Sequence, residues 1–487
     1  MQNKAKNINS NAVFNMLKSA LSIIYPLISF PYISRVLMAE NVGKINFGSS
    51  VISYFSLFAS LGVSTYAIRE CARVRDNKDF LDRVSSEIFS INLASTLLSY
   101  IMLFLVLMFA RPLANYRLLI CIQSATILFT TLGADWINTA MEDFRFIAIR
   151  TIAMQIVSLV LMFTFVRKPE HYIIYAITTV VASSGASIAN ILYRKKYCRM
   201  SFTIRMNARK HLPSIFMLFS LTLSQIIYVN SDMTILGLIQ GDFQVGLYST
   251  SVKIYTLINT MIASIALVVM PQLSAGFAKR DYDEINKLLK YALNFIIVLG
   301  IPCFCGIEII APHIICFFAG EEYSGAALSL RILGVSLMFS LVGGWIGNAS
   351  LIPAGREKVC LKASIACALV NVILNLLLIP KWGLNAAALT TAISELTGVM
   401  IMAPQIDKRI KITGMREMLK APIIGGLGII LIGLAVQSAF LEAWKVTLLT
   451  VPTSVIWYVF IMVIMNNQFF LEFIGPIINK IKGGQDK

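Results

Sequence analysis

The chain has 487 residues, of which 57% are hydrophobic and only 14% are charged. Soluble domains carry about 25% charged residues, and a chain this apolar could not cover its own surface in water, so a soluble globular protein is excluded and lipid is the expected solvent. The net charge of +17 does not indicate a nucleic-acid-binding protein, because the lysines and arginines fall between apolar runs rather than in one basic patch.

Apolar runs of the length of a transmembrane helix recur along the whole chain. A window of about 19 residues finds fourteen of them, and each is long enough to cross a hydrocarbon layer of about 30 Å. The connections are short, so neighbouring spans are expected to be antiparallel. We predict an all-α membrane protein with about 14 transmembrane helices, at residues 12–37, 43–68, 84–110, 115–141, 146–166, 171–193, 213–239, 244–275, 288–312, 324–352, 357–379, 384–405, 421–440 and 444–465.

Lysine and arginine residues fall unequally on the two sides that these spans define. The side of the N-terminus holds 31 of them and the opposite side holds 9, while Lys18 and Lys253 lie within spans. Cytoplasmic loops of membrane proteins carry the excess of Lys and Arg. Both termini of a multi-pass protein are therefore expected in the cytoplasm.

The longest basic loop divides the predicted spans into groups. Residues 1–193 form an N-terminal lobe of six spans, 194–212 a basic cytoplasmic linker, 213–410 a C-terminal lobe of six spans, and 411–487 two further spans with a cytoplasmic tail. The segments after spans 1 and 7, "ENVGKINFGSSVISYFSLF" (40–58) and "FQVGLYSTSVKIYTLIN" (243–259), share V-G, small residues and an aromatic-apolar run. This weak match predicts a parallel repeat, with a binding site between the two lobes.

Four stretches of the chain carry a resemblance to a known family: "PLISFPYISRVL", "NVGKINFGSSVISYFSLFASLGVSTYAIRECARVRD", "DMTILGLI…VGLYSTSVKIY" and "ALVNVILNLLLIPKWGLNAAALTTAISE". They resemble the Wzx-type polysaccharide (O-antigen and capsule repeat unit) flippases of the multidrug/oligosaccharidyl-lipid/polysaccharide superfamily. The most specific parts are G-x-x-x-Y-x-x-R-E (Gly62, Tyr66, Arg69, Glu70) and N-x-x-x-N…G-x-x-x-A-A (Asn371, Asn375, Gly383, Ala387, Ala388). Ala67 stands where the family usually has glycine, which affects no functional residue.

The resemblance implies two six-helix lobes and a transporter of the bacterial cytoplasmic membrane rather than an enzyme. It implies that undecaprenyl-pyrophosphate-linked oligosaccharide repeat units are translocated for O-antigen, capsule or exopolysaccharide synthesis, by alternating access through a central cationic cavity. The implied partners are this lipid-linked glycan, membrane lipids, and a polysaccharide polymerase with other assembly proteins. The alternatives are a cation-coupled drug exporter of the MATE type and, ranked lower because no long outer loop is expected, a membrane-embedded glycosyltransferase.

A large anionic headgroup needs ionisable groups inside spans and helices that can bend. In the first span, Lys18 lies about two turns above the cytoplasmic end, where it either snorkels to the interface or meets the headgroup. Pro26 and Pro31 leave the outer half of this helix bendable. We interpret them as an outer gate, with the cation of Arg35 at the outer end of the span. The alternative is a kinked helix with a snorkelling arginine.

Two opposite charges face each other across the predicted hairpin of spans 7 and 8. Lys253 is the best candidate for a cavity cation that meets phosphate, although it could also snorkel to the outer interface. Asp232 lies at a similar depth and is expected to pair with Lys253. This pair is either a structural salt bridge, one that phosphate displaces, or, if Asp232 titrates, a proton-coupling site.

The C-terminal lobe adds a midplane carboxylate and two amides to the candidate cavity. Glu395 should face a wet interior, for pairing, proton coupling or substrate contact. Asn371 and Asn375 share a helix face and either bind sugar hydroxyls or, the preferred interpretation, hold helices together. We find no motif for a catalytic residue, a metal or a cofactor, and expect no metal or disulfide role for the eight cysteines; coupling to H⁺ or Na⁺ stays open.

Overall fold

The computed structural model describes residues 2–203 and 208–472, and it describes side chains from Ile24 onward except at 204–210, Leu221 and Leu267. Within these ranges the chain forms helices joined by short turns, with no strand. It divides into two compact units, residues 1–246 and 247–487, and each unit is described separately.

The first unit is built around its N-terminal helix. Helix α1 packs against α3, α4, α6 and α8, and α7 packs against both α4 and α6. A buried cluster joins α2, α3 and α5. The helices of this unit are α1 (Gln2–Ser60), α2 (Val63–Arg73), α3 (Lys78–Phe109), α4 (Arg117–Gly133), α5 (Trp136–Ala140), α6 (Phe144–Phe165), α7 (Tyr172–Tyr193) and α8 (Ala208–Gln240), with 3₁₀ turns at Arg111–Tyr116, Pro169–His171 and Arg194–Lys196.

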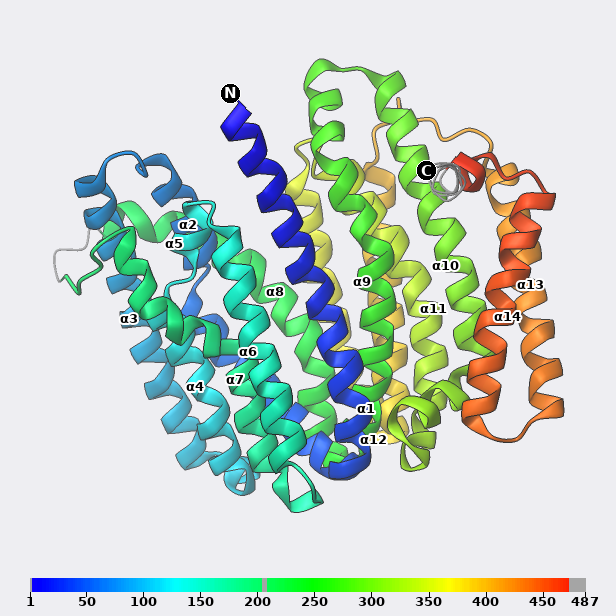
Figure 1. The fold of residues 1–487 in the computed structure, drawn as a ribbon, viewed down its shortest axis with the longest axis horizontal. Coiled ribbons are helices and arrows are strands. Elements are labelled where there is room, and N and C mark those ends of the chain that lie inside the picture. The colour runs from blue at the N-terminus through cyan, green and yellow to red at the C-terminus, as the bar shows by residue number, and fades with distance from the viewer. Residues whose placement is uncertain (1, 204–207, 473–487) are drawn as a thin grey trace, which may run out of the picture. The chain divides into compact units, whose positions relative to one another are not determined.

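The second unit places two C-terminal helices beside α10. Helix α10 packs against α11, α13 and α14 (Figure 1), and α11 packs against α12. The helices are α9 (Asp242–Lys279), which begins just before the boundary, α10 (Tyr282–Ala319), α11 (Ala327–Gly344), continued by the π-helical turn Trp345–Leu351, α12 (Glu357–Met402), α13 (Met415–Ala439) and α14 (Ala443–Ile464), with 3₁₀ turns at Glu321–Ala326 and Ala403–Gln405.

Two of these helices are too long for one crossing and contain one non-helical residue each. Helix α1 has 59 residues and leaves helical geometry at Met38, and α12 has 46 and leaves it at Gly383. At a rise of about 1.5 Å per residue, α1 is nearly three times and α12 about twice as long as the bilayer core of about 30 Å. The breaks fall between predicted spans 1 and 2 and between predicted spans 11 and 12, so each long helix corresponds to two predicted crossings.

The structure confirms the all-α membrane architecture. Twelve candidate spans occur within the described residues, and two of them correspond to two predicted crossings each, consistent with about 14. Large apolar side chains on these helices face outward, including Leu431 and Ile456 at 67% and 70% exposure, as expected where lipid replaces water.

The compact units do not follow the basic linker. The boundary falls after Gly246 because α8 packs against α1 and α2, which groups it with the helices before the linker. The predicted domain boundaries at 194–212 and 410 stay predictions.

Candidate functional site

The predicted gate in α1 has a specific contact between its cation and one of its prolines. Arg35 is exposed, and its Nη1 donates a hydrogen bond of 2.8 Å to the carbonyl oxygen of Pro31. Pro26 and Pro31 both lie within the helix, while the non-helical residue is Met38, with φ 64° and ψ 168°. The sharpest backbone change therefore comes three residues after Arg35. Lys18 is in the same helix, but its side chain lies outside the described residues.

Asp232 is buried in a polar seam within the first unit. Its side chain is 5% exposed. Two residues later in α8, Thr234 Oγ1 lies 2.9 Å from Ser50 Oγ and 3.2 Å from the hydroxyl of Tyr54, both on the second half of α1. A carboxylate buried in an apolar span is costly without polar partners. Asp232 has such partners, in a seam of hydroxyl groups.

A second polar seam runs through the second unit and contains Glu395. The Tyr255 hydroxyl on α9 lies beside Ser336 and Ser340 on α11, and Glu395 on α12 acts on it electrostatically. One turn further along α9, Asn259 Nδ2 donates to Ser340 Oγ at 3.3 Å. The seam therefore joins three helices through groups that can exchange hydrogen bonds with a polar ligand.

Lys253 is half-buried and lies two residues before Tyr255 on the same helix. Like Glu395, it has polar or electrostatic partners. Asp232 and Lys253 belong to different compact units, so their predicted ion pair stays a prediction.

Asn371 and Asn375 are buried and form a chain of hydrogen bonds inside α12. Asn375 Nδ2 donates to Asn371 Oδ1 at 3.0 Å, and the Thr390 hydroxyl donates to Asn375 Oδ1. Thr390 follows the Gly383 break, so these bonds tie the two halves of α12 together. They are the contacts that the packing interpretation requires; a role in sugar binding stays a prediction.

The tyrosine of the G-x-x-x-Y-x-x-R-E motif belongs to a buried relay that sequence reasoning missed. The Tyr66 hydroxyl lies 2.7 Å from His211 Nδ1, and His211 Nε2 lies 2.9 Å from Glu87 Oε2. Arg83 pairs with the other Glu87 oxygen at 3.1 Å. If Nε2 carries the proton, it donates to Glu87, and Nδ1 accepts from Tyr66. The relay fastens the first turn of α8 to α2 and α3.

A second missed cluster holds the basic stretch after α7 in place. Asp143 accepts hydrogen bonds from the hydroxyl groups of Tyr193 and Tyr197 and from the backbone N–H of Phe146. Burial alone would raise the pKa of Asp143, but these hydrogen bonds and the nearby Lys196 outweigh it and lower that pKa. Burial and the bond to Asp143 raise the pKa of Tyr197.

Metal ligation finds no support in the part of the chain that is described, where no three His, Cys, Asp or Glu side chains gather at one point. The site that the geometry offers is instead a set of buried polar seams within apolar helices. Such seams suit a polar or charged solute that crosses the membrane.

Comparison with known proteins gives one family and several relatives. The family model described as polysaccharide biosynthesis protein matches residues 6–277. A putative O-antigen transporter of Shigella dysenteriae is 23% identical over 402 residues, covering 81% of this chain and 99% of the relative. The capsular polysaccharide biosynthesis protein CapF of Staphylococcus aureus is 25% identical over 403 residues, covering 81% and 97%.

Solved structures share the fold across most of the chain. The lipid II flippase MurJ in an inward closed conformation has a TM-score of 0.75 at 17% identity, covering 96% of this chain and 100% of that one. An inward-facing multidrug resistance MATE transporter of the MOP superfamily has a TM-score of 0.61 at 15% identity, covering 78% and 92%. At these identities the likeness establishes the fold alone.

Proposed function

We propose that this chain, which belongs to the polysaccharide biosynthesis protein family, is a flippase that moves lipid-linked oligosaccharide repeat units across the membrane. The substrate that we infer is an oligosaccharide on an undecaprenyl-pyrophosphate carrier, delivered to the outer leaflet for O-antigen, capsule or exopolysaccharide assembly. In this proposal the protein is a carrier of the cytoplasmic membrane with both termini in the cytoplasm, and it catalyses no covalent step.

The observation that carries the proposal is a lysine inside an apolar helix. Lys253 follows the start of α9 by eleven residues, about 16 Å of helix, which is near the middle of a hydrocarbon core of about 30 Å. A pyrophosphate cannot cross hydrocarbon without a compensating cation, because an uncompensated charge there is very costly. Lys253, half-buried on α9, supports a role as that cation.

Alternating access requires points where long helices can change direction. Met38 and Gly383 are such points, because each is a non-helical residue within an otherwise continuous helix.

The carboxylates of Asp232 and Glu395 are our candidates for coupling transport to H⁺ or Na⁺, since both lie inside spans. A polysaccharide polymerase that consumes the flipped unit is the partner that we infer.

A drug exporter is the second candidate, because a MATE transporter shares the fold. A carrier of cations should concentrate carboxylates inside its spans. Here Lys253 is present as well as Asp232 and Glu395, and a cation at this depth favours an anionic solute.

Reconstitution in liposomes separates these functions. Flipping of a fluorescent polyprenyl-pyrophosphate oligosaccharide is measured by accessibility to a membrane-impermeant quencher, beside uptake of a cationic dye. We expect the lipid to move and the dye not to move; the reverse result would exclude the flippase. Lys253→Ala should slow flipping by about tenfold or more, equivalent to about 1.4 kcal/mol of lost interaction. Lys358→Ala, an exposed lysine at the start of α12, is the matched control.

The predicted ion pair has its own test in the same assay. If Asp232 and Lys253 act as a pair, the double variant Asp232→Ala with Lys253→Ala should flip no more slowly than either single variant. Strictly additive losses would show that the two residues act independently.

A further inference from the structure

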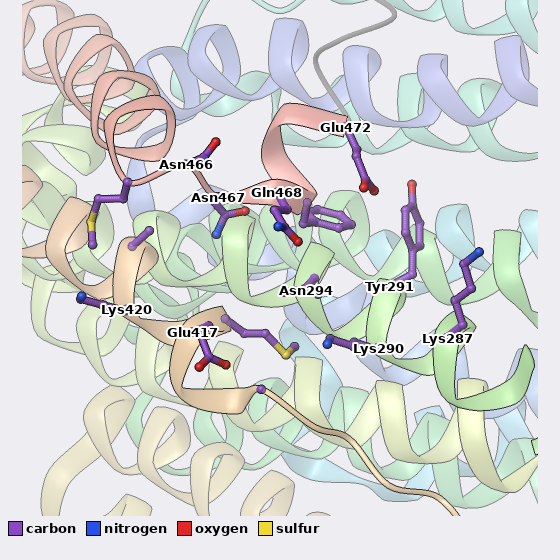
Figure 2. A pocket seen from close by; sticks show the side chains of 15 residues that line it. Lys287, Lys290, Tyr291, Asn294, Glu417, Lys420, Asn466, Asn467, Gln468 and Glu472 are labelled. Carbon is purple, nitrogen blue, oxygen red and sulfur yellow. The ribbon is translucent and has the colours of Figure 1, made fainter. Parts of the chain in front are cut away.

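The second unit contains a pocket that the proposed transport does not use. It lies between α10, the start of α13 and the residues that follow α14 (Figure 2), with a volume of about 600 Å³. Three lysines line it, Lys287 and Lys290 on α10 and Lys420 on α13, together with the carboxylates of Glu417 and Glu472. The pocket therefore carries more positive than negative charge.

Its lysines form no direct ion pair with the carboxylates beside them. Within the described ranges, none of the three lysines has a carboxylate oxygen within 4.0 Å. Lys290 is half-buried, and its Nζ lies 3.5 Å from the point that a Cβ on Gly414 would occupy. This ammonium group is therefore held against the first turn of α13 rather than extended into bulk solvent.

A buried amide without a partner points to a ligand in the same pocket. Asn294 lines the pocket and is 8% exposed. No side-chain hydrogen bond to Asn294 is formed by any part of the chain that the structure describes. The polar atoms of this amide are not fully enclosed by protein, so they are accessible from the pocket. Such a group is expected where its partner is a bound molecule rather than the protein.

The start of α13 adds further donors. Gly414 precedes this 25-residue helix with φ 80°, and no side-chain hydrogen bond caps it, although Glu417 Oε2 lies 3.0 Å from the point that a Cβ on Gly414 would occupy. The first N–H groups of an uncapped helix are open donors and attract anions. Lysine ammonium groups, an amide and helix N–H groups together form the donor set that binds a phosphate group.

We propose that this pocket binds the phosphate group of an anionic membrane lipid, with Lys290 and Asn294 as the main contacts. The location selects a lipid over a soluble phosphate, because the pocket lies at the ends of three membrane-spanning helices. Val463 and Ile464, directly before the pocket residue Met465, are 51% and 61% exposed, which gives acyl chains an apolar surface beside the headgroup. Basic pockets between helices on the cytoplasmic side commonly bind acidic lipids.

Lipid titration of the full-length protein tests this site. Protein purified in detergent and freed of native lipid is mixed with dioleoylphosphatidylglycerol, dioleoylphosphatidylcholine or inorganic phosphate, and bound lipid is counted by native mass spectrometry. We expect phosphatidylglycerol to bind most tightly. Lys290→Gln with Asn294→Leu should weaken it by about tenfold, the effect of losing about 1.4 kcal/mol. Glu417→Gln should tighten it, since a facing negative charge is removed.

The matched control removes charge without touching the pocket. Lys358→Gln with Lys362→Gln changes two exposed lysines of α12 in the same unit and should leave phosphatidylglycerol affinity unchanged. Equal weakening by this control would show non-specific attraction to net charge and overturn the proposal. Displacement of lipid by millimolar inorganic phosphate would identify a soluble-anion site instead. If the Lys290→Gln, Asn294→Leu variant does not fold, the phosphatidylglycerol affinity of Glu417→Gln tests the proposal instead. An affinity equal to that of the wild-type protein would then overturn it.

Discussion

Gly43 and Gly246 pack backbone against backbone at the starts of two helical segments. A Cβ on Gly43 would overlap the carbonyl oxygen of Asp242, and one on Gly246 would overlap the carbonyl oxygen of Ala39. Both are the glycine of the V-G pair in the two segments that the sequence suggested as a repeat. The pair therefore marks where the segment after the Met38 break meets the start of α9, and only glycine permits that approach.

Gly43→Ala should destabilise the protein by about 3 kcal/mol or more, because the added methyl would have to displace a backbone carbonyl. Thermal unfolding in detergent measures the effect. Gly306→Ala is the control, since a Cβ on Gly306 would meet no atom within 4 Å. Equal stability of the two variants would show that the close approach is relaxed in solution.

Met38 is held in a backbone region that is almost exclusive to glycine. Met38→Gly should therefore raise thermal stability by about 1 kcal/mol, since relief of strain exceeds the entropy cost of glycine. If this strain helps the helix change direction during transport, the stabilised variant should also flip lipid more slowly. Met102→Gly, a substitution inside α3 and away from its ends, should only lower stability. A loss of stability in both variants would contradict the strain at Met38.

The Tyr66–His211–Glu87 relay predicts a non-additive effect of mutation. Tyr66→Phe leaves His211 Nδ1 buried without its partner and should cost about 1–2 kcal/mol. Combining it with His211→Leu should cost less than the sum of the single losses, because both groups serve one contact. Tyr172→Phe is the control, since nothing in the described ranges hydrogen-bonds the Tyr172 hydroxyl. Additive losses would indicate two separate contacts.

The sequence was sufficient to predict the helical architecture, because span length and charge asymmetry are properties of local stretches. It even located the breaks near Met38 and Gly383, between predicted spans. The relay could not be predicted, since Tyr66 and His211 are 145 residues apart and nothing local marks the pairing. The sequence analysis used the lysines of the α10–α13 pocket only to orient the chain in the membrane. The sequence does not show that Lys290 and Asn294 lie close to Gly414, which is more than 100 residues away.

Asp143 gives the linker cluster a defined pH dependence. Its folded-state pKa is lowered, so its contribution to stability is complete above the unfolded value of about 3.9 and is lost as the pH falls through the folded value. Asp143→Asn should therefore lower the unfolding temperature at pH 7, and the difference from the wild-type protein should shrink below about pH 4. Asp76→Asn, in the exposed loop before α3, should show no such trend. A difference that grows on acidification would contradict the lowered pKa.

Arg35 and Pro31 should act together in the gate, because the guanidinium donates to the proline carbonyl. Removal of the charge by Arg35→Ala should slow flipping without preventing membrane insertion, since the side chain is exposed. Pro31→Ala restores a backbone donor and should stiffen the helix, which also slows flipping. Arg35→Lys keeps the cation but loses the forked donor geometry, so an intermediate rate is expected. Proteoliposome flipping rates at equal protein content measure all three, and wild-type rates for Arg35→Ala would remove the cation from the gate.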